Sequence, residues 1–413
     1  MLNDRRLYLI YAIILFDVIV GSAIAPIMPE FVKGLPRPQL WLSLGTAVFL
    51  GVQLFSAPLL GKLSDSYGRR PIFRLSALGT FLADMLLLPV RAWGFFGNRL
   101  TDGLTNGMYA TVRSAITDIS PKEHLFRNMG IEGTIVSFGF VLGPMVAGIV
   151  LTVFDVAGPN QATVIVRMAV LLSAVNILLT FLLGETHHNR TPADPAQLRA
   201  EVRQSLNVAA LWQRLVAKDR TRPGILILIL MQNVLMMSQG YYNYFVTFAS
   251  LGELRMDARA IAYFFMYFGL LSVFINFIFY AYLADRINQR RWVIVFAIVG
   301  VFVHLAYANV GGSLVWLYIV ITIDCLTISL IWGLLEGLLA HQTTDEDRGE
   351  IFGINQALNG FASLVTTLVF GGLSLIDLRL PFYWFAACIG VVGWLAWRRY
   401  QKQPVAEPDS AVL

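Results

Sequence analysis

The chain has 413 residues, of which 57% are hydrophobic and only 14% are charged. A soluble domain of this length needs more charge to cover its surface, so the composition excludes an ordinary soluble protein. The net charge of +5 comes from basic residues spread over many short segments, which argues against nucleic-acid binding. Cys325 and Cys388 both lie inside apolar runs, so we expect no disulfide framework.

Long apolar runs recur along the chain, and a helix that crosses a bilayer needs roughly 20 mostly apolar residues. The runs are too long and too continuous for the alternating strands of an outer-membrane barrel. The first run contains Asp17 and ends in Pro26 and Pro29, unlike a cleaved signal peptide. Twelve transmembrane helices are therefore predicted, at residues 7–29, 41–61, 71–91, 95–117, 128–152, 164–184, 223–250, 259–284, 292–309, 313–341, 350–372 and 380–398.

Lysine and arginine residues are distributed unevenly between the two sets of loops. With both termini in the cytoplasm, the cytoplasmic segments hold most of these residues. The opposite side keeps only Lys33, Arg37, Arg91, Arg255, Arg259 and Arg379 near its loops. This asymmetry follows the positive-inside rule and predicts cytoplasmic termini. The expected location is a cell membrane, in bacteria the inner membrane.

Residues 185–222 interrupt the apolar pattern and contain apolar positions at helical spacing, from Leu198 to Leu215. They predict one amphipathic helix on the cytoplasmic lipid surface, with a plain solvated linker as the alternative. Matched loops occur on either side of this segment: residues 61–70 resemble 281–291, and residues 120–130 resemble 344–353. Parallel repeats with a solute path between them are expected. The predicted organisation is a six-helix half at 1–184, the linker at 185–222, a second half at 223–400 and a cytoplasmic tail at 401–413.

Four motifs carry a resemblance to a known family. Residues 61–71 (GKLSDSYGRRP) closely resemble the loop between helices two and three of the major facilitator superfamily. Residues 97–103, 139–148 and 184–186 are similar to motifs in its fourth, fifth and sixth helices. The resemblance implies an all-α membrane protein, with twelve helices in two pseudo-symmetric halves. It also implies a secondary active transporter that works by alternating access.

Within this family, the first half most resembles the drug/proton antiporters of the tetracycline-resistance type. Residues 16–29 match their first helix with its carboxylate, and Asp84 matches a carboxylate on their third helix. No histidine occurs near Ser272, where that subgroup usually has one, and Asp102 and Asn106 replace a Gln/Gly-rich patch. The resemblance therefore implies antiport, and these departures argue against tetracycline as the substrate.

Ionisable residues inside the predicted spans are candidate proton-coupling groups, because a charge at membrane depth is costly unless it is paired, hydrated or neutralised by a proton. Asp17 lies near mid-membrane, with a structural hydrogen bond as the alternative role. Arg99 and Asp102 share a helix face, so they form either a coupling pair or a permanent ion pair. The full predicted set is Asp17, Asp84, Arg99, Asp102, Glu132 and Glu336.

Aromatic and amide side chains crowd predicted helices seven, ten and eleven. They predict a cavity for an amphiphilic organic solute, although some would serve as ordinary interhelical hydrogen bonds or interface tyrosines. The predicted cavity residues are Gln232, Asn233, Gln239, Tyr241, Tyr244, Asp324, Trp332, Asn355 and Asn359.

Two further groups of residues are predicted to control conformational change. Asp65 is expected to bind arginine and the first amides of a nearby helix, which would latch the cytoplasmic side. The predicted gate comprises Gly61, Asp65, Gly68, Arg69 and Arg70. Small residues and a proline predict a bend in helix five, with Gly139, Gly143, Pro144 and Gly148 as the hinge.

The function predicted from these features is proton-coupled export of drug-like or amphiphilic organic molecules. The alternatives are a proton-coupled symporter or facilitator of a small metabolite, and more distantly a receptor or scaffold with a transport fold. Motifs of intramembrane enzymes such as HExxH and GxSxG are absent from the sequence, so enzymatic activity is not expected. We expect no cofactor and no metal site, with a proton gradient as the energy source. The expected partners are a small organic solute, protons and the bilayer, and the expected oligomeric state is a monomer.

Overall fold

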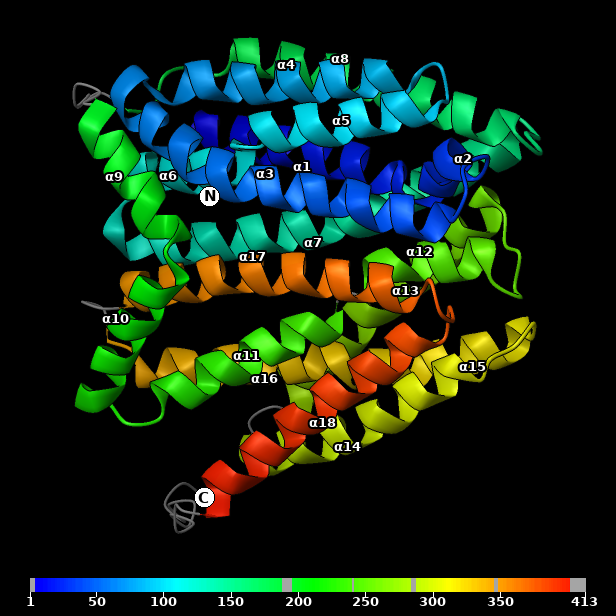
Figure 1. The fold of residues 1–413 in the computed structure, drawn as a ribbon. Helices are drawn as coiled ribbons and strands as arrows, with labels where there is room; N and C mark the ends of the chain where they lie inside the picture. Colours follow the sequence, from blue (N-terminus) through cyan, green and yellow to red (C-terminus); the bar gives the residue numbers. More distant parts are fainter. Residues whose placement is uncertain (1–3, 188–194, 240, 284–286, 345–347, 402–413) are drawn as a thin grey trace. The chain divides into compact units, whose positions relative to one another are not determined.

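The computed structural model describes residues 4–187, 195–239, 241–283, 287–344 and 348–401. All regular structure in these ranges is helical, as predicted (Figure 1). Nine helices in the described part are long and apolar enough to cross a membrane. They are Arg5–Val32, Pro38–Tyr67, Lys122–Val153, Asn160–Leu182, Ala258–Leu283, Gln289–Ala308, Leu314–Gln342, Gly349–Leu373 and Leu380–Tyr400.

Three more predicted spans correspond to shorter helices, which brings the total to the expected twelve. They are α4 (Arg69–Leu87), the pair α5 and α6 (Ala92–Thr105 and Met108–Ile119), and the pair α11 and α12 (Ile225–Gln239 and Tyr241–Leu251). The other long helices are α1 (Arg5–Ala23), α3 (Pro38–Tyr67), α7 (Lys122–Val153), α8 (Asn160–Leu182), α13 (Ala258–Ile278), α14 (Gln289–Ala308), α15 (Leu314–Cys325), α16 (Ile328–Gln342), α17 (Arg348–Leu373) and α18 (Leu380–Gln401). A 3-10 turn (Ala25–Ile27) and α2 (Met28–Val32) extend the first span beyond α1.

Predicted helices four and ten are each broken, which corrects the prediction of continuous spans. Asn106, with a ψ of 67°, leaves the helical conformation after α5. A Cβ on Gly107 would lie 2.6 Å from the Leu60 Cβ, so the break is where the chain passes closest to α3. In helix ten, the Thr327 hydroxyl donates to the Asp324 carbonyl at 2.9 Å and competes with the helical bonding pattern.

The linker contains two helices where the sequence predicted one. They are α9 (Pro195–Leu206) and α10 (Val208–Thr221), separated by Asn207. The Asn207 side-chain oxygen accepts the Ala210 N–H at 3.0 Å, which starts a new helix in the manner of an N-cap. Helical periodicity continues across this position, and for that reason the pattern alone did not show the break.

By contacts the chain groups into two compact units. Unit 1 comprises Met1–Leu211, Tyr242–Leu270 and Ser363–Leu378, and unit 2 comprises Trp212–Tyr241, Leu271–Ala362 and Arg379–Leu413. Unit 1 thus contains the first six spans together with parts of α12, α13 and α17. These units group residues that contact one another and do not follow the sequence repeat. The division of the chain into halves at 1–184 and 223–400 therefore stays a prediction.

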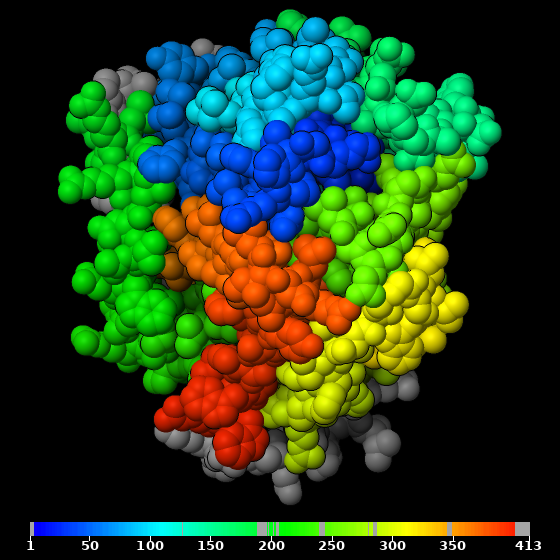
Figure 2. All heavy atoms as spheres, turned by 45° about the vertical axis from the view of Figure 1, so that its right-hand side comes forward, coloured from blue at the N-terminus to red at the C-terminus, as the bar shows by residue number. Residues whose placement is uncertain are grey.

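Within unit 1, α1 packs on α7 and α8, α3 packs on α5, and α4 packs on α5 and α8. Figure 2 shows the blue region of α2 and the start of α3 lying against α12 and the end of α17 in the same unit. The contact is close, because a Cβ on Gly371 would lie 2.7 Å from the Ser43 Cβ. Within unit 2, α18 packs on α14 and α11, and α16 packs on α11 and α14.

Candidate functional site

The predicted carboxylates of the first half come together inside unit 1. Asp17 lies on α1, Asp84 on α4, and Arg99 and Asp102 on α5. The Thr80 hydroxyl of α4 lies near the side chains of both Asp17 and Asp102. Asp84 is 1% exposed, and one oxygen each of Asp17 and Asp84 is buried without a hydrogen-bond partner. These two carboxylate oxygens are therefore available to bind a proton.

Arg99 supplies the positive charge of this cluster. Its Nε donates to Asn98 Oδ1 at 2.8 Å, and its guanidinium lies over the rings of Phe49 and Phe95, 5.5 and 6.0 Å from the centroids. Its charge also reaches Asp84 and Asp102 electrostatically. The guanidinium is thus held by an amide and two rings while it faces several carboxylates. This geometry differs from a closed pair with Asp102.

A cavity of about 180 Å³ adjoins the cluster within unit 1. Arg99 forms part of its wall, and the rest is mainly aromatic and small side chains of α1, α3, α12 and α17. Sites for drug-sized ligands are roughly 300–1,000 Å³, so this cavity accommodates one ring or a small headgroup at most. Its aromatic and hydroxyl-bearing members include Ser22, Ser43, Thr46, Phe49, Phe95, Phe140, Thr247 and Phe370.

Glu132 lies beyond this cluster on α7, where its carboxylate is 3% exposed and 3.5 Å from the Arg113 guanidinium. Tyr109 of α6 interacts electrostatically with Asp17, Asp102 and Glu132. Tyr109 therefore links the membrane cluster to Glu132. Sequence analysis missed Thr80 and Tyr109, because a single hydroxyl on an apolar helix carries no periodic signal. The remaining predicted acid, Glu336, occupies an exposed position on α16 in unit 2.

Three of the predicted cavity amides meet in unit 2. The Asn355 amide of α17 donates to Gln232 Oε1 of α11. The Asn233 amide donates to the Ile229 carbonyl at 2.8 Å and approaches Asn355 Oδ1 at 3.4 Å. Gln232 is fully buried, so this amide cluster joins two helices as well as offering polar groups. Asn359 is 2% exposed, and Trp332 is half-buried.

The other predicted cavity residues are distributed differently. Tyr244 belongs to unit 1, where its hydroxyl donates to the Leu378 carbonyl at 2.7 Å and its ring packs on Phe370, 5.3 Å between centroids. Tyr244 thus packs against Phe370, which lines the cavity. Asp324 is buried in unit 2 and accepts a bond from Tyr307. The side chains of Gln239 and Tyr241 lie outside the part that the structure describes.

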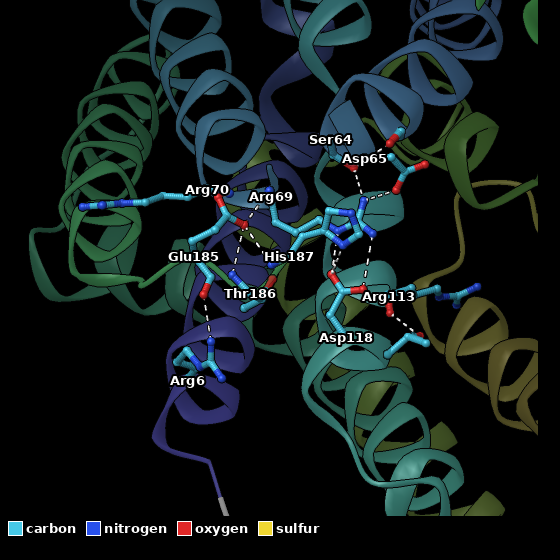
Figure 3. Close-up of polar contacts among 12 residues, drawn as sticks. Arg6, Ser64, Asp65, Arg69, Arg70, Arg113, Asp118, Glu185, Thr186 and His187 are labelled. Atoms are coloured by element: carbon cyan, nitrogen blue, oxygen red, sulfur yellow. Dashed lines mark hydrogen bonds and ion pairs between the residues drawn. The ribbon is translucent and has the colours of Figure 1, made fainter. Parts of the chain in front are cut away.

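The charged gate residues Asp65, Arg69 and Arg70 belong to a polar cluster at the junction of α3 and α4, with buried Arg69 at its centre (Figure 3). Gly68 ends α3 with a φ of 101°, a left-handed value that favours glycine, and α4 begins at the next residue. Arg69 is 4% exposed and pairs with Asp65, and its Nε donates to Asp118 at 2.8 Å. Its Nη1 also donates to Ser64 Oγ at 2.6 Å. One arginine therefore ties α3, α4 and α6 together.

Glu185 completes this cluster. The sequence predicted that Asp65 would bind the first amides of a nearby helix, and the structure corrects this prediction. Those amides bind Glu185, not Asp65: the Arg69 N–H donates to Oε1 at 2.9 Å and the Arg70 N–H to Oε2 at 3.3 Å. Thr186 and His187 donate their N–H groups to Oε1 at 3.0 Å each. Burial raises the pKa of Glu185, but the four backbone N–H bonds outweigh it and hold the pKa below its ordinary value. A carboxylate at a helix N-terminus is also favoured by the helix dipole.

The remaining gate residue and the hinge glycines differ in how tightly they pack. Gly61 is in ordinary contact with Ala110, at 3.8 Å from an added Cβ. A Cβ on Gly143 would lie 2.0 Å from Ser22 Oγ and 2.7 Å from the Ile19 carbonyl oxygen of α1. One on Gly139 would lie 2.8 Å from Val18, whereas Gly148 meets α13 at ordinary distances of 3.5 Å. Gly139 and Gly143, beside Pro144, therefore let α7 approach α1 closely.

Comparison with known sequences fits a multi-pass transporter. The chain matches the Major Facilitator Superfamily over residues 7–323 and 228–412, and it belongs to that family. It is 26% identical over 379 residues to the class C tetracycline resistance protein of Escherichia coli, with 89% of each chain covered. It is 21% identical over 401 residues to multidrug resistance protein 2 of Bacillus subtilis (strain 168), covering 95% of this chain and 94% of that one.

Coverage is smaller for the class H tetracycline resistance protein of Pasteurella multocida, which is 30% identical over 153 residues, 35% of this chain and 38% of that protein. Solved structures share the fold. The human organic anion transporter MFSD10 (TETRAN) has a TM-score of 0.65 at 18% identity, covering 96% of this chain and all of that one. A POT family transporter bound to a thioalcohol-conjugated peptide has a TM-score of 0.74 at 11% identity, with 96% of each chain covered. The protein is therefore a membrane transporter, as its motifs predicted.

Proposed function

We propose that this transporter is a proton-coupled antiporter that exports drug-like or amphiphilic organic molecules. The observation that carries the proposal is the cluster of Asp17, Asp84, Asp102 and Arg99 in unit 1. The Asp84 and Asp102 carboxylates face the Arg99 guanidinium, and Asp17 lies near Asp102, so full ionisation would leave two uncompensated negative charges. Removing one such charge from water costs several kcal/mol even after relaxation. The proposed resting state therefore holds at least one proton on these carboxyls.

The proposed coupling follows from competition for these carboxylates. A solute that places polar or cationic groups beside Arg99 in the cavity changes the field at Asp84 and Asp102. Proton binding and solute binding then exclude each other, which is the requirement for exchange. Asp17 interacts electrostatically with Asp102, so it senses the same change. Each tenfold change in proton affinity corresponds to about 1.4 kcal/mol of coupling.

The proposed substrate class rests on the cavity wall and on the relatives. Phenylalanine rings beside hydroxyls and one charged group suit a solute with an aromatic part and a polar part. The relatives include tetracycline and multidrug resistance proteins. We propose that the Gln232–Asn233–Asn355 amide cluster binds polar groups of a solute within unit 2. We also propose that the protein works as a monomer in the bacterial inner membrane, with both termini in the cytoplasm.

Proteoliposomes with an imposed pH gradient test this proposal. Three probes of different charge are used, namely ethidium, tetracycline and fluorescein, and entrapped pyranine reports the movement of protons. Antiport predicts that at least one probe moves uphill while protons move the opposite way. Co-movement of probe and protons would replace antiport by symport, and probe movement without protons would indicate a facilitator. A panel of small metabolites, tested in the same proteoliposomes in place of the three probes, is the matched comparison.

A further inference from the structure

Unit 2 contains a buried ionisable cluster that the proposed coupling site does not use. His304 and Tyr307 lie three residues apart on α14, and both are fully buried. The Tyr307 hydroxyl donates to Asp324 Oδ2 of α15 at 3.0 Å. The Thr327 hydroxyl lies 3.4 Å from Asp324 Oδ1, and Asp324 itself is 1% exposed. A carboxylate and an imidazole thus share a site without access to bulk water.

His304 is positioned by its own helix and by aromatic neighbours. Its Nδ1 lies 2.9 Å from the Gly300 carbonyl oxygen, so that nitrogen carries a hydrogen in either protonation state. The ring makes edge contacts with Tyr307 and Phe385, at centroid distances of 5.9 and 6.1 Å. Proton exchange at His304 therefore takes place at Nε2. The imidazole is close enough to Asp324 for a direct electrostatic interaction.

The helix positions of this pair repeat those of the carboxylates in the first half. Asp84 follows the first residue of α4 by fifteen positions (84 − 69), and His304 follows the first residue of α14 by fifteen (304 − 289). Asp102 follows the first residue of α5 by ten (102 − 92), and Asp324 follows that of α15 by ten (324 − 314). Both α5 and α15 are the first pieces of broken spans. The internal repeat thus places ionisable pairs at matching points of both halves.

We propose that His304 and Asp324 form a second proton-binding site, the counterpart in the second half of Asp84 and Asp102. The inference rests on the proposed function for its role in coupling, although proton binding itself does not. With one proton shared, the pair is either imidazolium with carboxylate or imidazole with carboxylic acid, and both states are neutral overall. Losing that proton leaves one buried negative charge, which the Tyr307 hydroxyl stabilises by donating to Asp324 Oδ2. The site can therefore bind and release one proton while its net charge changes only between zero and minus one.

The surroundings of His304 limit which groups take part. From α15 the titratable groups are Asp324 and the neighbouring Cys325, whose sulfur accepts from Ser272 Oγ at 3.5 Å. From its own helix the group is Tyr307. From α18 the neighbours are the rings of Phe382 and Phe385, which do not titrate. Thr327 precedes α16 and contributes a hydroxyl. Imidazole is thus the group of this set whose ordinary pKa lies near neutral pH, and the Asp324 carboxyl is its acidic neighbour.

Nuclear magnetic resonance of the full protein in lipid nanodiscs, labelled with ¹³C-histidine, tests the proposal. The sequence has five histidines, and the His304 signal is the one missing in His304→Gln. If that variant does not fold, the signal is the one retained in each of the four variants His124→Gln, His187→Gln, His188→Gln and His341→Gln. We expect the signal to titrate between roughly pH 5 and pH 8, the range in which histidine changes charge.

Matched variants separate a proton site from a structural bond. Asp324→Asn should move the titration midpoint of His304 by about one pH unit or more, whereas Tyr307→Phe should move it by less. Asp17→Asn should leave it unchanged, which keeps this outcome separate from the flux assay of the proposed function. An imidazole that stays in one protonation state across the whole range would overturn the proposal. So would a midpoint that is indifferent to Asp324→Asn.

Discussion

The Glu185 carboxylate caps the helix that begins at Arg69, because its Oε1 accepts the Arg69 N–H at 2.9 Å. Glu185 follows the sixth span, and Arg69 begins the third, so the bond joins segments 116 residues apart. The Arg6 side chain donates to the Glu185 carbonyl at 2.8 Å, which adds the first helix. Three spans of unit 1 are therefore fastened at one residue.

Replacing Glu185 with Gln should destabilise the protein in a pH-dependent way. The amide keeps one acceptor but loses the negative charge that four N–H groups surround, at a cost of about 1 kcal/mol, as for other helix caps. The pKa of Glu185 is lower in the folded protein, so its contribution is complete above the ordinary glutamate pKa and is lost as pH falls through the lowered value. Melting temperatures of both proteins should differ at pH 7 and converge in acid. Exposed Glu123→Gln is the control, and an equal difference at every pH would contradict the assignment.

Asp65→Asn should slow transport while leaving solute binding nearly intact. Arg69 keeps its bonds to Asp118 and Ser64, and Asp65 is 36% exposed, so the loss is about 1 kcal/mol or less. We expect flux to fall by about three- to tenfold at unchanged Kd, with conformational balance as the cause. Asp118 is less exposed, at 17%, so Asp118→Asn should be the more severe variant. A binding defect as large as the flux defect would contradict a gating role.

Gly143→Ala should be strongly destabilising, because the added Cβ meets a backbone carbonyl of α1 that cannot rotate away. Overpacking of this kind costs about 1–3 kcal/mol. Gly130, on the same helix α7, has nothing within 4 Å of an added Cβ. Gly130→Ala should therefore be neutral or stabilising by up to about 1 kcal/mol. Thermal unfolding of the two variants in one detergent measures the contrast, and similar melting temperatures would show that α7 does not need this close approach.

The positions of the helices could be predicted from the sequence far better than the arrangement of the sites. Helix positions could be predicted because lipid requires long apolar segments, whatever their neighbours. The breaks at Asn106 and Thr327 could not, since they depend on Leu60 and on a hydroxyl bond to Asp324. Asp17, Asp84 and Asp102 were identifiable as charges at membrane depth. Thr80, which lies near two of them, is one hydroxyl among many and becomes significant only once α1, α4 and α5 are packed together.

The gate residues, too, could be predicted from the sequence only in part. Asp65, Arg69 and Arg70 stand in a compact motif, so they could be recognised together. Asp118 and Glu185 are 49 and 116 residues from Arg69 in the sequence, and no local pattern links them. The sequence predicts no chemistry for His304, because the five histidines show no metal-ligand spacing. Its match to Asp84 emerged only from the observed starts of α4 and α14.

Topology can be tested with introduced cysteines, because both native cysteines are buried. The positive-inside pattern predicts that residue 205 in the linker faces the cytoplasm and that residue 34 faces the other side. Ser205→Cys and Gly34→Cys should react with an impermeant maleimide from opposite sides of oriented vesicles. An added Cβ at Gly34 meets nothing within 4 Å, so this variant should fold normally. Labelling of both from one side would refute the predicted orientation.

Asp17→Asn is the most direct test of coupling at the membrane cluster. The amide resembles the protonated carboxyl in shape and is also neutral, so the helices should remain packed. It cannot release a proton, so uphill flux driven by a pH gradient should be abolished while exchange of solute for solute persists. A membrane potential of 100 mV contributes about 2.3 kcal/mol per charge moved, and the variant should also lose that contribution. Flux and exchange are measured in the same proteoliposomes, with Asp155→Asn as the control because its carboxylate is 95% exposed. Undiminished proton-driven accumulation would transfer the coupling role to Asp84 and Asp102.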